Sequence, residues 1–162
     1  MNYEQLFADT QNKRVDYHGD PVGILKTIQA LGQINNERSF YALVNVVSTF
    51  NQNSATRYDC DAVYPAIQIL QRLNDPRAFN AFVKALKFPQ DGGWAVPVEA
   101  AIALGRLGDK RAIKPLKEAV RRPEAQVREA RDALWRMGNL TWKLEPHQKS
   151  LYDFFHSRTN KT

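Results

Sequence analysis

The chain has 162 residues, a net charge of +6 and a single cysteine. The length predicts one domain with a core of its own, and one cysteine excludes an internal disulfide and a Cys-x-x-Cys metal site. The sequence has no apolar run of about 18 residues and no basic-then-apolar leader. We therefore expect a soluble, cytoplasmic protein that acts at no membrane.

The predicted elements are α-helices arranged in pairs along the chain. Residues 1–20 are expected to cap the first pair, and residues 140–157 to form a C-terminal cap helix. The first helices of the pairs are predicted near residues 21–34, 61–73, 96–107 and 124–137, and the second helices near residues 37–49, 76–87 and 110–122. The repeats of this single domain, 1–162, are thus 21–50, 61–87, 96–122 and 124–138. Pro65 fits if its helix begins near Asp61, because an earlier start would place the proline inside the helix and kink it.

A six-residue junction that occurs four times marks the boundary between first and second helices. The copies are residues 31–36 (LGQINN), 70–75 (LQRLND), 104–109 (LGRLGD) and 134–139 (LWRMGN). The fifth residue is Asn or Gly, which accept the left-handed conformation that ends a helix. The sixth is Asn or Asp, which are preferred helix N-caps. Each junction therefore predicts a helix end, a tight corner and a helix start.

The spacing of the junctions predicts how the helix pairs are arranged. The copies start 39, 34 and 30 residues apart, which is typical of helix pairs that stack into a solenoid. After each corner, apolar residues recur at helical spacing, beginning with Phe40, Phe79 and Ile113. We predict an all-α solenoid, a right-handed superhelix of about three and a half helix pairs with terminal caps.

Residues 96–138, and above all the segment AAIALGRLGDKRAIKPL at 100–116, resemble the HEAT-like repeat of the phycobilisome-lyase type. The resemblance extends over roughly residues 21–138 and implies an α-solenoid. Proteins with this repeat include subunits that attach linear tetrapyrroles (bilins) to cysteines of phycobiliproteins. Others act in phycobilisome turnover, and others are bacterial scaffolds that handle no pigment. The isomerising lyases of this group carry a His-Cys pair, and Cys60 has no such neighbour.

The residues with catalytic or metal-binding chemistry do not form a recognisable set. Cys60 lies between Asp59 and Asp61, whose negative charges oppose thiolate formation. His18, His147 and His156 have no His or Cys partner at ligand spacing. We expect no catalytic residue, no metal and no cofactor, although a bilin is the cofactor implied if the resemblance extends to function.

The expected binding surface is the inner, concave face formed by the second helices. Residues 101–143 hold 11 Lys or Arg against 5 Asp or Glu, so this face should change from neutral to basic toward the C-terminus. The candidate contacts are Tyr41, Asn45, Lys84, Lys87, Lys114, Lys117 and Arg121, with Tyr58 and Trp94 in the connections at its edge. A solvated helix face is the alternative interpretation of the basic residues.

We interpret the chain as a non-catalytic protein-interaction scaffold that binds an acidic partner protein. The alternative is a subunit or chaperone in bilin attachment to phycobiliproteins or in their turnover, with a phycobiliprotein or a second HEAT-like subunit as partner. A second alternative is nucleic-acid binding. It has less support, because no aromatic residues alternate with the basic ones to stack on bases.

Overall fold

The computed structural model describes residues 21–49, 57–88, 95–120 and 127–138, and these residues are helical apart from short turns. The helices are α2 (Pro21–Ile34), α3 (Glu37–Thr49), α4 (Arg57–Leu73), α5 (Phe79–Ala85), α6 (Ala95–Leu107), α7 (Ile113–Val120) and α8 (Val127–Arg136). Short 3₁₀ turns, Pro76–Ala78 and Lys110–Ala112, lead into α5 and α7. The predicted caps at 1–20 and 140–157 lie outside the described residues.

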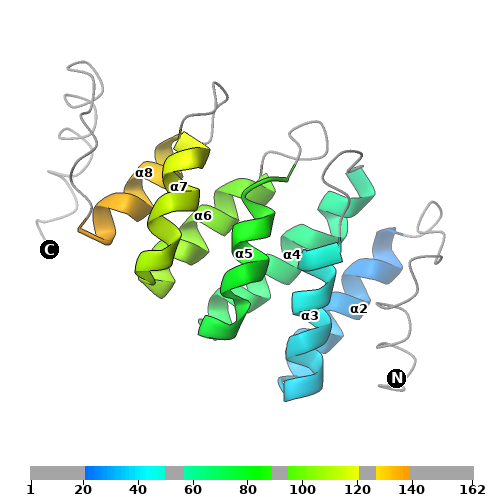
Figure 1. Cartoon of the computed structure of the whole chain (residues 1–162). Coiled ribbons are helices and arrows are strands. Elements are labelled where there is room, and N and C mark those ends of the chain that lie inside the picture. The colour runs from blue at the N-terminus through cyan, green and yellow to red at the C-terminus, as the bar shows by residue number, and fades with distance from the viewer. Residues whose placement is uncertain (1–20, 50–56, 89–94, 121–126, 139–162) are drawn as a thin grey trace, which may run out of the picture.

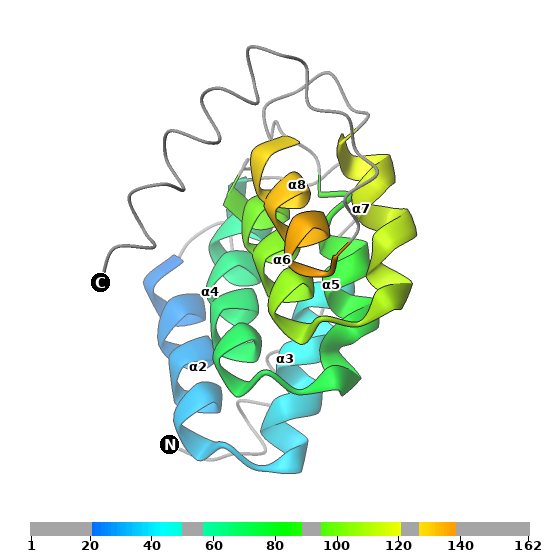
Figure 2. The same cartoon turned by 90° about the vertical axis from the view of Figure 1, so that its left-hand side faces the viewer.

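The helices stack in two layers (Figures 1 and 2). One layer holds the first helices α2, α4, α6 and α8, each packed on the next, and the other holds the second helices α3, α5 and α7. Each second helix also packs against the first helix of the following pair, as α3 does on α4 and α7 on α8. The predicted all-α solenoid is confirmed, with three and a half helix pairs among the described residues.

The core runs unbroken through the stack, and the junction leucines lie at its centre. Leu31, Leu70 and Leu104 are fully buried and Leu134 is 1% exposed. A buried leucine stabilises a fold by about 1.5–3 kcal/mol relative to an exposed one. The first residue of every junction therefore holds its first helix in the core.

The corners have the conformation that the junction predicts. The fifth residues all have positive φ: 46° at Asn35, 50° at Asn74, 65° at Gly108 and 70° at Gly138. Glycine has no Cβ to oppose this conformation, and asparagine tolerates it better than most residues. Each first helix therefore ends at the same position of its repeat.

The sixth junction residue caps the helix that follows. The Asp75 carboxylate accepts a hydrogen bond from the backbone N–H of Arg77 at 2.8 Å, and Asp109 accepts one from that of Arg111 at 2.9 Å. In the first corner, the Asn36 side chain accepts from the Ser39 N–H at 2.8 Å. The predicted caps are thus confirmed in three corners, and the fourth, Asn139, lies outside the described residues.

In two corners the capping carboxylate also holds an arginine that reaches back to the preceding repeat. Arg77 pairs with Asp75 at 2.7 Å, and its guanidinium lies 4.7 Å from the ring centre of Phe40 in α3. Arg111 pairs with Asp109 at 2.6 Å and lies 4.5 Å from the ring centre of Phe79 in α5. We call this Asp–Arg–Phe arrangement the corner clamp. It adds a cation–π contact between neighbouring repeats.

Helix α4 corrects one expected boundary and the interpretation of two residues. It begins at Arg57 rather than near 61, so Pro65 lies inside the helix. A proline there has no N–H for the carbonyl of Asp61. Packing of α4 against α2, α3 and α6 offsets this loss. Tyr58, expected in a connecting loop, lies in the first turn of α4.

Two glycines test how closely the first helices approach. A Cβ at Gly105 would lie 2.8 Å from the Cβ and 3.0 Å from the backbone Cα of Ala133, whereas a Cβ at Gly32 would meet the side-chain tip of Ile69 at 2.8 Å.

Replacing either glycine with alanine has two opposing effects on stability. Overpacking costs about 1–3 kcal/mol, and alanine recovers about 0.5–1 kcal/mol of helix propensity. We expect Gly105→Ala to destabilise the fold by about 1–2 kcal/mol, as measured by urea unfolding. Gly32→Ala should cost clearly less, because a side-chain tip moves more easily than a backbone, and an equal or larger loss would contradict this account.

The corner clamps predict how stability depends on pH. Hydrogen bonds from Arg77 and Arg111 hold the pKa values of Asp75 and Asp109 below their ordinary value of 3.8. A carboxylate with a lowered folded-state pKa contributes stability above its unfolded pKa, and this contribution is lost as the pH falls through the folded pKa. Below about pH 4, the parent chain should therefore lose stability more steeply than the Asp75→Asn/Asp109→Asn variant, whose asparagines retain the caps.

Thermal unfolding of both proteins between about pH 2.5 and pH 7 measures this difference. The Arg77→Gln/Arg111→Gln variant should show a partly flattened acid limb, because it removes the guanidinium of each pair but keeps the backbone hydrogen bond that also lowers the aspartate pKa. Parallel curves for all three proteins would show that the clamps contribute no pH-dependent stability.

Candidate functional site

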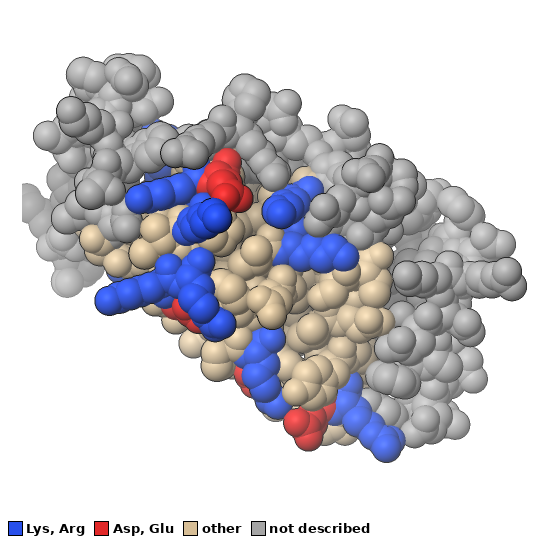
Figure 3. All heavy atoms as spheres, viewed as in Figure 1, with Lys and Arg blue, Asp and Glu red and all other residues tan. Residues whose placement is uncertain are grey.

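The second-helix face, made by the outward side chains of α3, α5 and α7, carries most of the predicted contact residues. Lys87 and Lys114 are exposed, and Asn45 and Lys117 are half-buried. Tyr41 is 49% exposed. Figure 3 shows that basic side chains outnumber acidic ones on this side of the molecule.

Tyr41 is held in place although half of it is exposed. The Tyr41 ring meets the Phe40 ring edge-on, with the ring centres 5.4 Å apart. The Arg77 guanidinium lies 5.7 Å from the centre of the Tyr41 ring. An aromatic side chain that is fixed before binding loses little entropy on association and is a frequent interface anchor. The neutral end of the second-helix face therefore offers an aromatic contact.

Lys84 has a structural contact that the sequence did not reveal. Its ammonium donates a hydrogen bond to the backbone carbonyl of Ser48, near the C-terminal end of α3. Cations stabilise helix C-termini, where backbone carbonyls lack donors. Lys84, half-buried on α5, thus ties α5 to α3 and presents less free charge than its neighbours.

The corner clamps decide which cations of this side remain available. Arg77 and Arg111 are each paired with an aspartate of their own corner. On α5, the turn after it and α7, the charged side chains are Lys84, Lys87, Lys114 and Lys117 against Glu118. On α3 they are Glu37 and Arg38, which balance. The second-helix face is therefore neutral at α3 and basic at α5 and α7, as predicted.

The remaining predicted contacts are Tyr58, Trp94 and Arg121. Tyr58 belongs to α4 in the first-helix layer. Trp94 and Arg121 lie outside the described residues, as do His18, His147 and His156. The expected contact edge formed by Tyr58 and Trp94 therefore stays a prediction.

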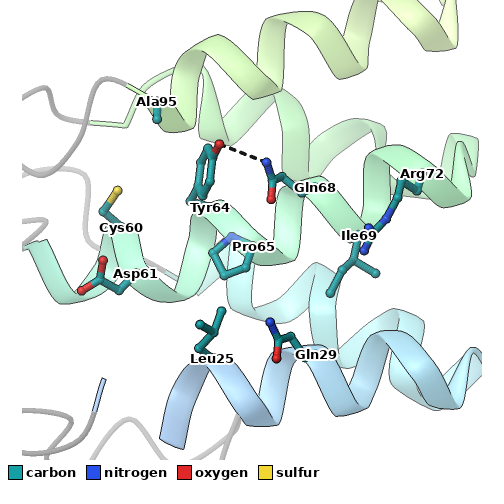
Figure 4. Close-up of a pocket in the computed structure, with 10 residues that line it drawn as sticks. All are labelled: Leu25, Gln29, Cys60, Asp61, Tyr64, Pro65, Gln68, Ile69, Arg72 and Ala95. Carbon is teal, nitrogen blue, oxygen red and sulfur yellow. Dashed lines mark hydrogen bonds between the residues drawn. The ribbon is translucent and has the colours of Figure 1, made fainter. Parts of the chain in front are cut away.

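A groove on the first-helix layer was not predicted. Its volume is about 640 Å³, and α4 supplies most of its lining, with α2 on one side and the start of α6 on the other (Figure 4). The lining residues are Leu25, Gln29, Cys60, Asp61, Tyr64, Pro65, Gln68, Ile69, Arg72 and Ala95. The side chain of Gln68 donates a hydrogen bond to the Tyr64 hydroxyl at 3.0 Å.

Two signals in the sequence relate to this groove. Leu25 and Gln29 occupy the same repeat positions as Tyr64 and Gln68, so the register predicts that they face the same side. The early start of α4 was not recognised, and it brings Cys60 and Asp61 into the lining. The groove combines an apolar floor with an acidic group at one end and Arg72 at the other.

The described residues also limit the chemistry that this part of the chain supports. No three His, Cys, Asp or Glu side chains gather there as potential metal ligands. None of the described helices is long and apolar enough to span a bilayer. Cys60 is half-buried beside Asp61 at the groove.

Comparison with known proteins agrees with the lyase-type repeat predicted from the sequence. A 63-residue stretch is 43% identical to "Phycocyanobilin lyase subunit alpha" of Picosynechococcus sp.. It covers 36% of this chain and 24% of that relative, so the chain matches about a quarter of the relative's length. The likeness therefore concerns repeats and not a whole protein.

The family model for HEAT repeats matches residues 55–135, half of the chain. The match runs from the first turns of α4 to the end of α8, through two complete helix pairs and their corners. The stacked helix pairs with their left-handed corners agree with this match, and the chain belongs to the HEAT repeat family.

Proposed function

We propose that this HEAT repeat protein is a non-catalytic cytoplasmic scaffold that binds an acidic partner protein on its second-helix face. The observation that supports this most is the group of three lysines, Lys87 in the turn after α5 and Lys114 and Lys117 on α7, with Glu118 as their acidic neighbour. The arginines of the same side are neutralised in the corner clamps. The lysines are thus the cations that a partner would meet.

The rigidity of the stack supports a binding function. The second helices are fixed by the core and by the corner clamps, so the lysines and Tyr41 are arranged before a partner arrives. A preformed surface spends little free energy on ordering side chains. Complementary charge also speeds association and orients the partner.

A second candidate is a role in bilin attachment to phycobiliproteins, or in their turnover. It is favoured by the likeness to a subunit named for phycocyanobilin lyase activity. Because the match covers 24% of that relative, this chain would act as a subunit or chaperone beside a second HEAT-like protein. The lysines would then meet the carboxylates of a bilin or the acidic surface of a phycobiliprotein.

Charge reversal of the lysines tests the scaffold proposal. Lys87→Glu/Lys114→Glu/Lys117→Glu should weaken binding of the purified partner at least about tenfold, since each exposed ion pair contributes about 0.2–1 kcal/mol and reversal adds repulsion. Lys84 is left intact because it contacts Ser48. The partner is first captured by the full chain from its own cells, and its affinity is then measured by titration calorimetry.

The matched control reverses three exposed cations that belong neither to the lysine group nor to the first-helix C-termini, Lys26, Arg38 and Lys110. This control should retain the partner, and both variants should keep the parent's circular dichroism and melting temperature. An equal loss of partner affinity in both variants would show that binding depends on net charge and not on the positions of the lysines. Captured nucleic acid whose log affinity falls with log salt at about −0.9 per neutralised phosphate would replace the protein-partner proposal.

The bilin candidate has its own test. The chain is co-expressed with a phycobiliprotein subunit and phycocyanobilin, with and without a second HEAT-like subunit. The candidate predicts either a stable complex with the phycobiliprotein or more covalent adduct when the chain is present, read from absorbance and from bilin fluorescence in denaturing gels. The bilin candidate is excluded if the chain forms no complex and adds no adduct, both with and without the second subunit.

A further inference from the structure

The third residue of the junction forms a row of cations that the corner geometry does not use. It is Gln33 in the first copy and then Arg72, Arg106 and Arg136. All three arginines are exposed and lie in the last turn of α4, α6 and α8. Within the described ranges none of them has an ion pair or a hydrogen bond. We call these three residues the arginine row.

The row lies at the edge where the corners of successive repeats line up (Figures 1 and 2). The neighbouring cations of this edge, Arg77 and Arg111, are neutralised by Asp75 and Asp109. The arginine row is therefore a positive strip that is unpaired among the described residues, with one guanidinium for each repeat after the first.

The spacing of the row follows from the packing of the first helices. α4 packs on α6, and α6 on α8, and packed helix axes are about 8–10 Å apart. On an α-helix, residues seven apart lie on the same face and are separated by about 10.5 Å. Carboxylates at every seventh residue of a helix lying across the stack would thus meet successive guanidiniums.

An apolar row runs beside the arginine row. The next junction residues are Ile34, 38% exposed, and Leu73, 36% exposed, followed by the half-buried Leu107 and Met137. A basic strip with an adjoining apolar strip matches the two faces of an acidic amphipathic helix. A nucleic acid backbone would gain nothing from the apolar side chains.

The surrounding acids also favour a protein partner over a polyanion. Glu129 and Asp132 lie within two turns of Arg136, and Glu99 lies within two turns of Arg106. These carboxylates would repel a continuous line of phosphates, whereas a helix whose glutamates recur about every seven residues places them at the guanidiniums and can leave the positions between them uncharged. Favourable interaction of an arginine with the helix dipole explains a cation at a helix C-terminus, but it does not explain the apolar row beside it.

We propose that the arginine row and the apolar row form a second docking surface, which binds an acidic amphipathic helix of a partner protein lying across the first-helix ends. This surface is separate from the lysines of the second-helix face and does not depend on them. The first repeat contributes apolar contact through Ile34, and the later repeats add charge.

The test uses the full chain and a synthetic helical peptide whose glutamates recur about every seven residues, with leucines on the adjoining face. A peptide of the same composition in a different order is the matched probe. We expect the first peptide to bind, to gain helicity on binding, and to lose about tenfold or more of its affinity to Arg72→Gln/Arg106→Gln/Arg136→Gln, in line with three exposed ion pairs. Ile34→Ser/Leu73→Ser should weaken it further.

The control variant Lys87→Gln/Lys114→Gln/Lys117→Gln removes the same charge from the second-helix face and should leave peptide affinity unchanged. Melting temperatures of all variants distinguish lost binding from lost stability. The proposal is overturned by equal binding of both peptides, by affinity that survives the arginine substitutions, or by a DNA oligonucleotide that competes as well as the ordered peptide. The arginine variants and the lysine variants share no residue. A negative result for the arginine row therefore leaves the proposal for the lysines of the second-helix face intact, and a negative result for the lysines leaves the arginine-row proposal intact.

Discussion

The corner clamp is the interaction on which the arrangement of this protein depends. A residue with positive φ ends the first helix, and the following aspartate caps the second helix and pairs with the arginine two positions later. That arginine, Arg77 or Arg111, lies over the phenylalanine of the preceding repeat. One short segment therefore reverses the chain, starts a helix and attaches the repeat to its neighbour. Ile113 takes the phenylalanine's position in the third repeat, and Thr141 takes the arginine's position after the fourth junction, so the two partners of the clamp disappear together.

Because every first helix ends at a residue with positive φ in the same junction position, side chains at equivalent positions line up in rows across the stack. The chemistry of a row then follows from whether the corner uses its members. The arginines after the corner, Arg77 and Arg111, are paired with aspartates, whereas those before it, Arg72 and Arg106, form no ion pair among the described residues. Two arginines of the same repeat, only five positions apart, thus differ in whether an aspartate pairs with them. The total number of basic residues in the sequence does not distinguish the arginine before the corner from the arginine after it. The geometry of the capping aspartate does, because the aspartate pairs only with the arginine after the corner.

The features that the sequence predicted are local and repeated, and those it missed depend on packing between distant segments. Asn35, Asn74, Gly108 and Gly138 were identified because each stands between a leucine-bearing helix end and a cap. The early start of α4 was missed because Pro65 normally excludes an interior position, and contact with three neighbouring helices overrides that preference. The contact from Lys84 to Ser48 joins residues 36 positions apart, and no pattern within one repeat indicates it. The groove along α4 was missed because Cys60 and Asp61 enter its lining through the early start of α4 at Arg57.

Both proposed surfaces change in the same direction along the solenoid, and this has a consequence for binding. At the first repeat the second-helix face carries Tyr41 and Asn45, and the row at the corner edge begins with Gln33, so both are uncharged there. Toward α7 and α8 both become basic. A stack of equivalent repeats would let a partner slip by one repeat at little cost. With a gradient, each such slip moves a carboxylate from a cation to a neutral side chain, and charge complementarity of this kind fixes register and direction more than it adds affinity. On both proposals, the acidic end of a partner would be held toward the C-terminal repeats, and its apolar end toward Tyr41 on the second-helix face or toward Ile34 on the corner edge.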